Sequence, residues 1–103
     1  MKRTLLSIFM TTAAAVSFAQ NSIVQTNYTT DPAPMADGDR MYVYTGHDED
    51  NANFFWMNDW RVYSSADMVN WTDHGSPLSL ASFSWTDGRA WATQTIKRND
   101  KYY

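Results

Sequence analysis

The strongest constraint on the fold is a tight-turn signal followed at once by a run of strand-forming residues. Asp37-Gly38 is a dipeptide typical of two-residue hairpin turns. The run MYVYT at residues 41–45 favours a β-strand and contains no residue that would break one. We therefore predict two antiparallel strands, at residues 32–36 and 40–46.

The next segments continue the same pattern. Residues 60–64 (WRVYS) alternate between polar and apolar side chains and predict a third strand, and residues 71–75 (WTDHG) predict a short fourth one. The Ser, Asp and Asn residues at 65–70 favour a turn between them. Residues 32–75 thus predict a four-stranded antiparallel meander, and since no helical periodicity follows residue 19, the fold class is all-β.

A second unit begins after a loop. Residues 90–97 predict a strand, residues 98–100 a turn, and residues 101–103 the start of the partner strand. A chain that stops in the middle of a hairpin would leave an open sheet edge. We therefore expect residues 20–103 to be the truncated N-terminal part of a longer domain.

The N-terminus has the layout of a secretory signal peptide. Lys2 and Arg3 precede an uncharged, largely apolar stretch at residues 5–18, and small side chains stand at Ser17 and Ala19. The stretch is too short and too often broken by polar residues for a membrane span. An amphipathic first helix is the alternative, but no charged face exists to meet water. We expect residues 1–19 to be cleaved off and the protein to be secreted or periplasmic.

The composition of the remaining chain excludes several partners. Without Lys2 and Arg3, 6 of the 8 basic residues remain against 11 acidic ones, so we expect no nucleic-acid partner. The N-terminal apolar stretch is too short for a membrane span, so we expect no membrane partner either. There is no cysteine for a disulfide or a thiolate metal site, and we predict no cofactor and assign no metal ligand. The five Trp and six Tyr residues can fill a small core or bind flat ligands, and composition does not decide between these uses.

Asp31 is the first candidate for chemistry. The following Pro32 restricts it to extended backbone, which fixes the direction of its carboxylate, as a general base requires. Asp-Pro is also a common opening of a turn, so the dipeptide alone leaves a structural role open.

Three segments together resemble the opening of glycoside hydrolase family 43. They are TDPAP at residues 30–34, MYVYTGHDE at 41–49 and YSSADMVNWTDHG at 63–75, and their order and spacing match the family as well. The resemblance implies a five-bladed β-propeller, of which this chain would hold the first blade and the start of the second. It also implies hydrolysis of β-xylosides or α-L-arabinofuranosides, as in xylan, arabinan and arabinoxylan, with inversion at the anomeric carbon.

The resemblance assigns Asp31 the role of general base. Inverting hydrolysis needs a base and an acid about 6.5–9.5 Å apart, with a water between the base and the sugar. The acid Glu and a second Asp that tunes it are expected beyond residue 103. Glu49 lies in an acidic run, where a solvated loop is the better interpretation.

Three further residues are candidates for substrate binding. Trp91 begins the second meander as Asp31 begins the first, and the resemblance implies an indole against the sugar, although Thr93 replaces the proline often found there; a core tryptophan is the alternative. His47 and Asp48 follow the second predicted strand, beside the expected pocket. In the turn at 65–71 we expect Asp67 to cap backbone amides and Trp71 to pack between blades.

Two other functions remain open at this stage. The chain could be a secreted, non-catalytic carbohydrate-binding β-domain that uses its Trp and Tyr side chains as stacking platforms. It could also belong to an unrelated propeller, such as a sialidase-like protein. An enzyme requires further blades with an Asp and a Glu after Tyr103, so the downstream reading frame separates these readings.

Overall fold

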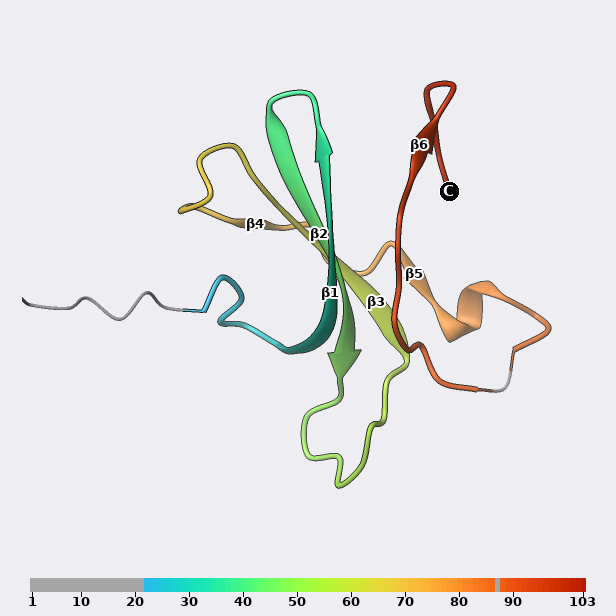
Figure 1. Cartoon of the computed structure of the whole chain (residues 1–103). Coiled ribbons are helices and arrows are strands. Elements are labelled where there is room, and N and C mark those ends of the chain that lie inside the picture. Colours follow the sequence, from blue (N-terminus) through green and yellow to red (C-terminus); the bar gives the residue numbers. More distant parts are fainter. Residues whose placement is uncertain (1–21, 87) are drawn as a thin grey trace, which may run out of the picture.

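The computed structural model describes residues 22–86 and 88–103, so the signal peptide expected at residues 1–19 lies outside the described residues. The described part is all-β, as predicted, apart from one short 3₁₀ turn (Figure 1). No helix in it is long and apolar enough to cross a membrane. The elements are β1 (Tyr28–Asp37), β2 (Arg40–Asp48), β3 (Asp59–Ser65), β4 (Thr72–Asp73), β5 (Leu78–Ser79), η1 (Leu80–Ser82), β6 (Lys97–Arg98) and β7 (Lys101–Tyr102).

The main sheet is the predicted meander. Strands β1, β2, β3 and β4 lie side by side in chain order, and each pair is antiparallel. After β4 the chain folds back, and β5 pairs with the first two residues of β3. The sequence did not predict β5, because a two-residue strand shows no alternation that could be recognised.

The turn between β1 and β2 has the geometry that its glycine allows. Asp37 pairs with Arg40, and Gly38 has a φ of +60°. A positive φ at the first central position of a two-residue turn suits glycine and matches the twist of the flanking strands. The tight turn predicted from Asp37-Gly38 is therefore confirmed.

A β-bulge interrupts β1 at the predicted general base. Thr30 pairs with Gly46 and Ala33 with Tyr44, so Asp31 and Pro32 together lie opposite Thr45. The expectation that Pro32 holds Asp31 in extended backbone is wrong, because Asp31 has a φ of +50°. The extra residue of a bulge must leave the extended region, and aspartate tolerates left-handed backbone better than most residues.

The second unit contains less strand than predicted. Of the strand expected at 90–97, only Ile96 and Lys97 pair with a partner: Lys97 faces Tyr102, and Ile96 exchanges two backbone hydrogen bonds of 3.0 Å with Tyr103. Asn99 and Asp100 form the turn, with φ values of +50° and +56°. Residues 91–95 have no paired strand beside them in the described chain, so the local β-propensity there does not produce a ladder.

The two hairpins are joined through one carboxylate. Lys97 Nζ donates to Asp37 Oδ1 at 2.8 Å, and the Tyr102 hydroxyl donates to the same carboxylate. This contact holds the β6–β7 hairpin beside the turn that ends β1. Together the two hydrogen bonds and the lysine charge keep the pKa of Asp37 below its usual value.

Buried side chains lie on both faces of the sheet. Val43 and Tyr63 are directly paired and share one face, whereas Val62 points to the other. Met57 and Ala90 are also buried, and the Ala90 amide donates to the Met57 carbonyl at 3.1 Å. The loop between β2 and β3 and the start of the second unit are therefore packed together against the sheet.

The turn after β3 is organised by Asp67, as expected. Its Oδ1 accepts the backbone amides of Val69 at 2.9 Å and Asn70 at 2.7 Å, and its Oδ2 accepts the Asn70 side-chain amide at 2.7 Å. Hydrogen bonds to the ionised form hold the pKa of Asp67 well below its usual value. Trp71 follows this turn and is half-buried, and its packing between blades stays a prediction.

Candidate active site

The predicted site residues lie towards one end of the sheet. There β1 begins, β2 ends and β3 begins, and the register places Thr29 opposite His47, two residues before Asp31 (Figure 1). Trp91 reaches the same end through Trp60, the first residue of β3 to pair with β2. Among the described residues, no hydrogen bond or ion pair joins any two of the four predicted site residues.

Asp31 is exposed, and the bulge determines where it stands. Thr45, the residue opposite, is only 3% exposed, and its hydroxyl has no hydrogen-bond partner in the described structure. Bulges often occur beside active sites because they redirect a side chain out of the regular pleat. The Asp31 carboxylate likewise makes no hydrogen bond to another described residue, so it is available to a ligand.

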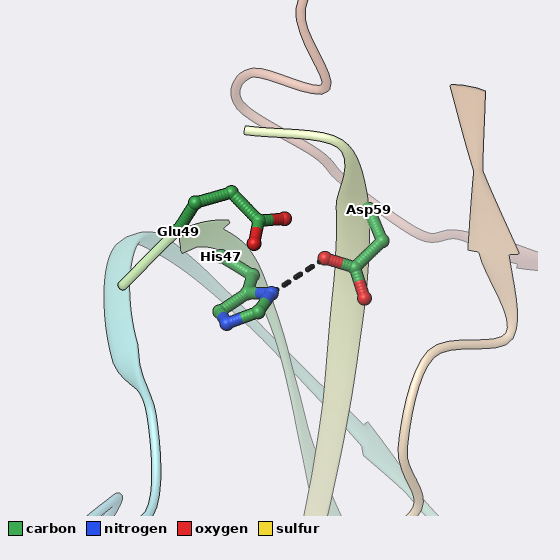
Figure 2. Close-up of side chains that lie close together, drawn as sticks. All are labelled: His47, Glu49 and Asp59. Atoms are coloured by element: carbon green, nitrogen blue, oxygen red, sulfur yellow. Dashed lines mark hydrogen bonds and ion pairs between the residues drawn. The ribbon is translucent and has the colours of Figure 1, made fainter. Parts of the chain in front are cut away.

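His47 is buried at the end of β2 and is paired with a residue that the sequence analysis missed. Its Nδ1 lies 2.6 Å from Asp59 Oδ1, and both side chains are more than four-fifths buried (Figure 2). Asp59 Oδ2 in turn forms an ion pair with Arg61 Nε at 3.1 Å. Facing positions on neighbouring strands can be read from a sequence only if the register is known, and the ten-residue connection between β2 and β3 leaves it open.

Glu49 completes a cluster with this pair. One ligand-type atom from each of His47, Glu49 and Asp59 lies within 4.8 Å of the others. Glu49 is half-buried rather than freely solvated, and its Oε1 accepts the Asn58 side-chain amide at 3.1 Å. A metal held by both His47 and Asp59 would need more than 2.6 Å between their ligand atoms, because each bond to it spans about 2.0–2.2 Å. We assign no metal to the cluster.

Asp48 lies on the opposite face of the sheet from His47. It pairs with Tyr28, and it is half-buried. Successive residues of a strand point to opposite faces, so the two neighbours cannot contact the same ligand group from one side of the sheet. They can share a ligand only beyond the strand end.

Trp91 is held by two hydrogen bonds and keeps an accessible indole. Its Nε1 donates to the Phe55 carbonyl at 3.2 Å, and its carbonyl accepts the Trp60 Nε1 at 3.0 Å. The residue is 52% exposed, so within the described chain it is not a core tryptophan. An indole fixed in this way offers a rigid flat surface.

The loop between β2 and β3 adds exposed aromatic residues that the sequence analysis did not single out. Phe54, Phe55 and Trp56 are 67%, 62% and 46% exposed, and the Arg89 guanidinium lies 3.6 Å from the centre of the Trp56 ring. The run NFFW at residues 53–56 was the available signal, because three consecutive aromatic residues cannot all be buried in a short loop.

An antiparallel blade with an accessible carboxylate and a fixed tryptophan at one end is suited to binding carbohydrate, because polar groups and flat apolar surfaces complement a sugar. The sequence profile of the glycosyl hydrolases family 43 matches residues 19–103. The chain belongs to this family.

Curated relatives agree with this membership. The chain is 32% identical over 90 residues to a xylosidase/arabinosidase of Bacteroides ovatus, which covers 79% of this chain and 28% of that protein. It is 32% identical over 105 residues to an arabinoxylan arabinofuranohydrolase of Bacillus subtilis (strain 168), covering 81% of this chain and 20% of that protein. The chain thus spans about a quarter of the length of these relatives.

Solved structures show the same fold. A GH43_1 enzyme from Xanthomonas citri complexed with xylose superposes with a TM-score of 0.72 at 30% identity, over 78% of this chain and 24% of that one. A β-xylosidase/α-arabinofuranosidase from a compost metagenome, in complex with xylotriose, gives 0.74 at 27% identity, over 81% and 28%. The prediction that the meander is part of a family 43 five-bladed β-propeller is confirmed.

Proposed function

We propose that the protein containing this chain is a glycoside hydrolase that cleaves O-glycosidic bonds of pentose polysaccharides or oligosaccharides, such as xylan, arabinan or arabinoxylan. The family match over residues 19–103 carries the proposal. The xylosidase/arabinosidase and arabinofuranohydrolase relatives, and the neighbours complexed with xylose and xylotriose, support the choice of pentose substrates.

In the proposed mechanism Asp31 is the general base and the reaction inverts the anomeric carbon. The Asp31 carboxylate takes a proton from a water while the water oxygen attacks that carbon. The bond to the leaving oxygen breaks, and an acid elsewhere in the protein protonates this oxygen. The exposed carboxylate in the β1 bulge, without a described hydrogen-bond partner, supports this role.

Trp91, His47 and Asp48 are the proposed substrate-binding residues. The half-exposed Trp91 indole can stack on a pentose ring, and the two polar side chains can hydrogen-bond its hydroxyls. The alternative is a non-catalytic carbohydrate-binding module, which would use the same aromatic surface. Binding of xylo-oligosaccharides without any hydrolysis by the full-length protein would favour that module over the enzyme.

The test of the general base is Asp31→Asn in the full-length protein, assayed on an aryl β-xyloside and an aryl α-L-arabinofuranoside. The amide preserves the shape but removes the basicity, so kcat should fall by about 10² to 10⁴-fold while KM changes little. Glu49→Gln is the matched control and should have a far smaller effect. Retention of most turnover by Asp31→Asn would show that another residue is the base.

Inversion is tested separately, by following the anomeric proton of the first-formed sugar by NMR. The product released from a β-xyloside should be α-xylose before mutarotation. A β-xylose product would contradict the inverting mechanism while leaving the substrate class intact.

A further inference from the structure

The His47–Asp59 pair is set by the sheet itself. Gly46 pairs with Trp60, and the next facing positions along the two antiparallel strands are His47 and Asp59. Facing residues point to the same side of a sheet, which brings Nδ1 and Oδ1 to 2.6 Å. The contact lies between neighbouring strands of one blade.

Asp59 also forms an ion pair with Arg61. Their side chains lie on the same face, two residues apart on β3, and Arg61 Nε is 3.1 Å from Asp59 Oδ2. One carboxylate oxygen therefore faces the imidazole and the other faces a guanidinium. The Asp59 side chain is only 14% exposed, so few other partners can compete for its carboxylate.

The hydrogen bond to Asp59 determines which nitrogen of the neutral His47 ring carries the proton. A carboxylate accepts hydrogen bonds, so Nδ1 must hold the proton and Nε2 must present a lone pair. In Figure 2 Nε2 points away from Asp59, and it has no hydrogen-bond partner among the described residues. His47 lies opposite Thr29, two residues before Asp31, so the imidazole belongs to the same end of the sheet as the Asp31 bulge.

We propose that Asp59 is a positioning residue for substrate binding: it fixes the tautomer and orientation of His47, so that Nε2 accepts a hydrogen bond from a pentose hydroxyl beside Asp31. The proposal rests on the proposed function, because it needs a pentose in this site. It assigns a role to Asp59 and Arg61, which touch no substrate and act only through His47.

The test is a double-mutant cycle in the full-length protein, on whichever aryl pentoside the wild type hydrolyses. His47→Ala should raise KM about five- to tenfold, the loss of about one hydrogen bond, with a smaller change in kcat. Asp59→Asn should raise KM similarly, but should add almost nothing in the His47→Ala background. Asp50→Asn, an exposed acidic change in the adjacent loop, is the control and should leave KM unchanged.

The coupling between the two substitutions distinguishes a positioning role of Asp59 from a purely structural one. If the KM increases of the two single variants multiply in the double variant, Asp59 acts independently of His47 and the inference is overturned. It is also overturned if neither substitution alters KM. If Asp59→Asn does not fold, ¹⁵N NMR of wild-type His47 at pH 8 decides, because Nδ1 must carry a proton; a bare Nδ1 overturns the inference. Loss of the proposed function would instead appear as a wild type without pentosidase activity or an active Asp31→Asn variant.

Discussion

The turn after β3 is stabilised by the hydrogen bonds of a single side chain, Asp67. It accepts two backbone amides and a side-chain amide from the two residues Val69 and Asn70. The ionised carboxylate is the form that makes these bonds, so the folded state lowers the pKa of Asp67. The stability of this turn therefore depends on pH.

The pKa of Asp67 is depressed in the folded state, so its contribution to stability is complete above the unfolded value of about 4 and is lost as the pH falls below it. We predict that Asp67→Asn lowers the melting temperature of the full-length protein at pH 7. The loss in melting temperature should shrink when the melts are repeated below about pH 4. Asp39→Asn, at the exposed β1–β2 turn, is the matched control. An equal loss in melting temperature for Asp67→Asn at pH 7 and below about pH 4 would contradict this account.

At the scale of elements, β2 is packed so closely that a side chain at Gly46 would have to displace its neighbours. A Cβ added at Gly46 would lie 3.1 Å from Met57 Sδ and 3.2 Å from Thr30 Cγ2. The thioether of Met57 can move, but Thr30 belongs to β1 and immediately precedes the bulge. A larger side chain at Gly46 would therefore press on the residue that immediately precedes Asp31.

We predict that Gly46→Val destabilises the full-length protein by about 1–3 kcal/mol through overpacking. It should also lower kcat, because moving Thr30 displaces Asp31. Denaturant melts and steady-state kinetics measure the two effects. Gly88→Ala, where an added Cβ meets nothing within 4 Å, is the control. Wild-type turnover in a destabilised Gly46→Val variant would show that the bulge does not depend on this packing.

At the scale of the whole molecule, the described chain leaves large apolar groups exposed. Trp85, Val69 and Tyr28 are 80%, 78% and 70% exposed, and the chain spans about a quarter of its relatives. We predict that residues 20–103 produced alone show no sharp cooperative thermal transition and bind a hydrophobic dye. A sharp transition from a monomer, followed by calorimetry, would show that one blade is stable by itself.

The whole protein is also expected to be exported, through the signal peptide at residues 1–19, which lie outside the described residues. We propose that the signal peptide is removed after Ala19, so the mature protein should begin at Gln20. N-terminal sequencing of the protein recovered from the periplasm or the medium measures this. Recovery of an intact Met1 from the cytoplasm would contradict it.

The local elements follow from short stretches of the sequence. Alternation at residues 60–64, the β-favouring run at 41–45 and the Asp37-Gly38 turn each encode their geometry within a few residues, and the structure has all three. The Asp67 cap was predictable for the same reason, because it satisfies amides two and three residues away.

Contacts between residues that are distant in the chain depend on the three-dimensional pairing of segments. The bulge at Asp31 depends on pairing with Thr45, the His47–Asp59 contact depends on the register across a ten-residue connection, and β5 exists only because β3 offers it an edge. Residues 91–95 have strand propensity but no paired strand among the described residues. Pairing is a property of two segments together, and neither segment alone specifies its partner.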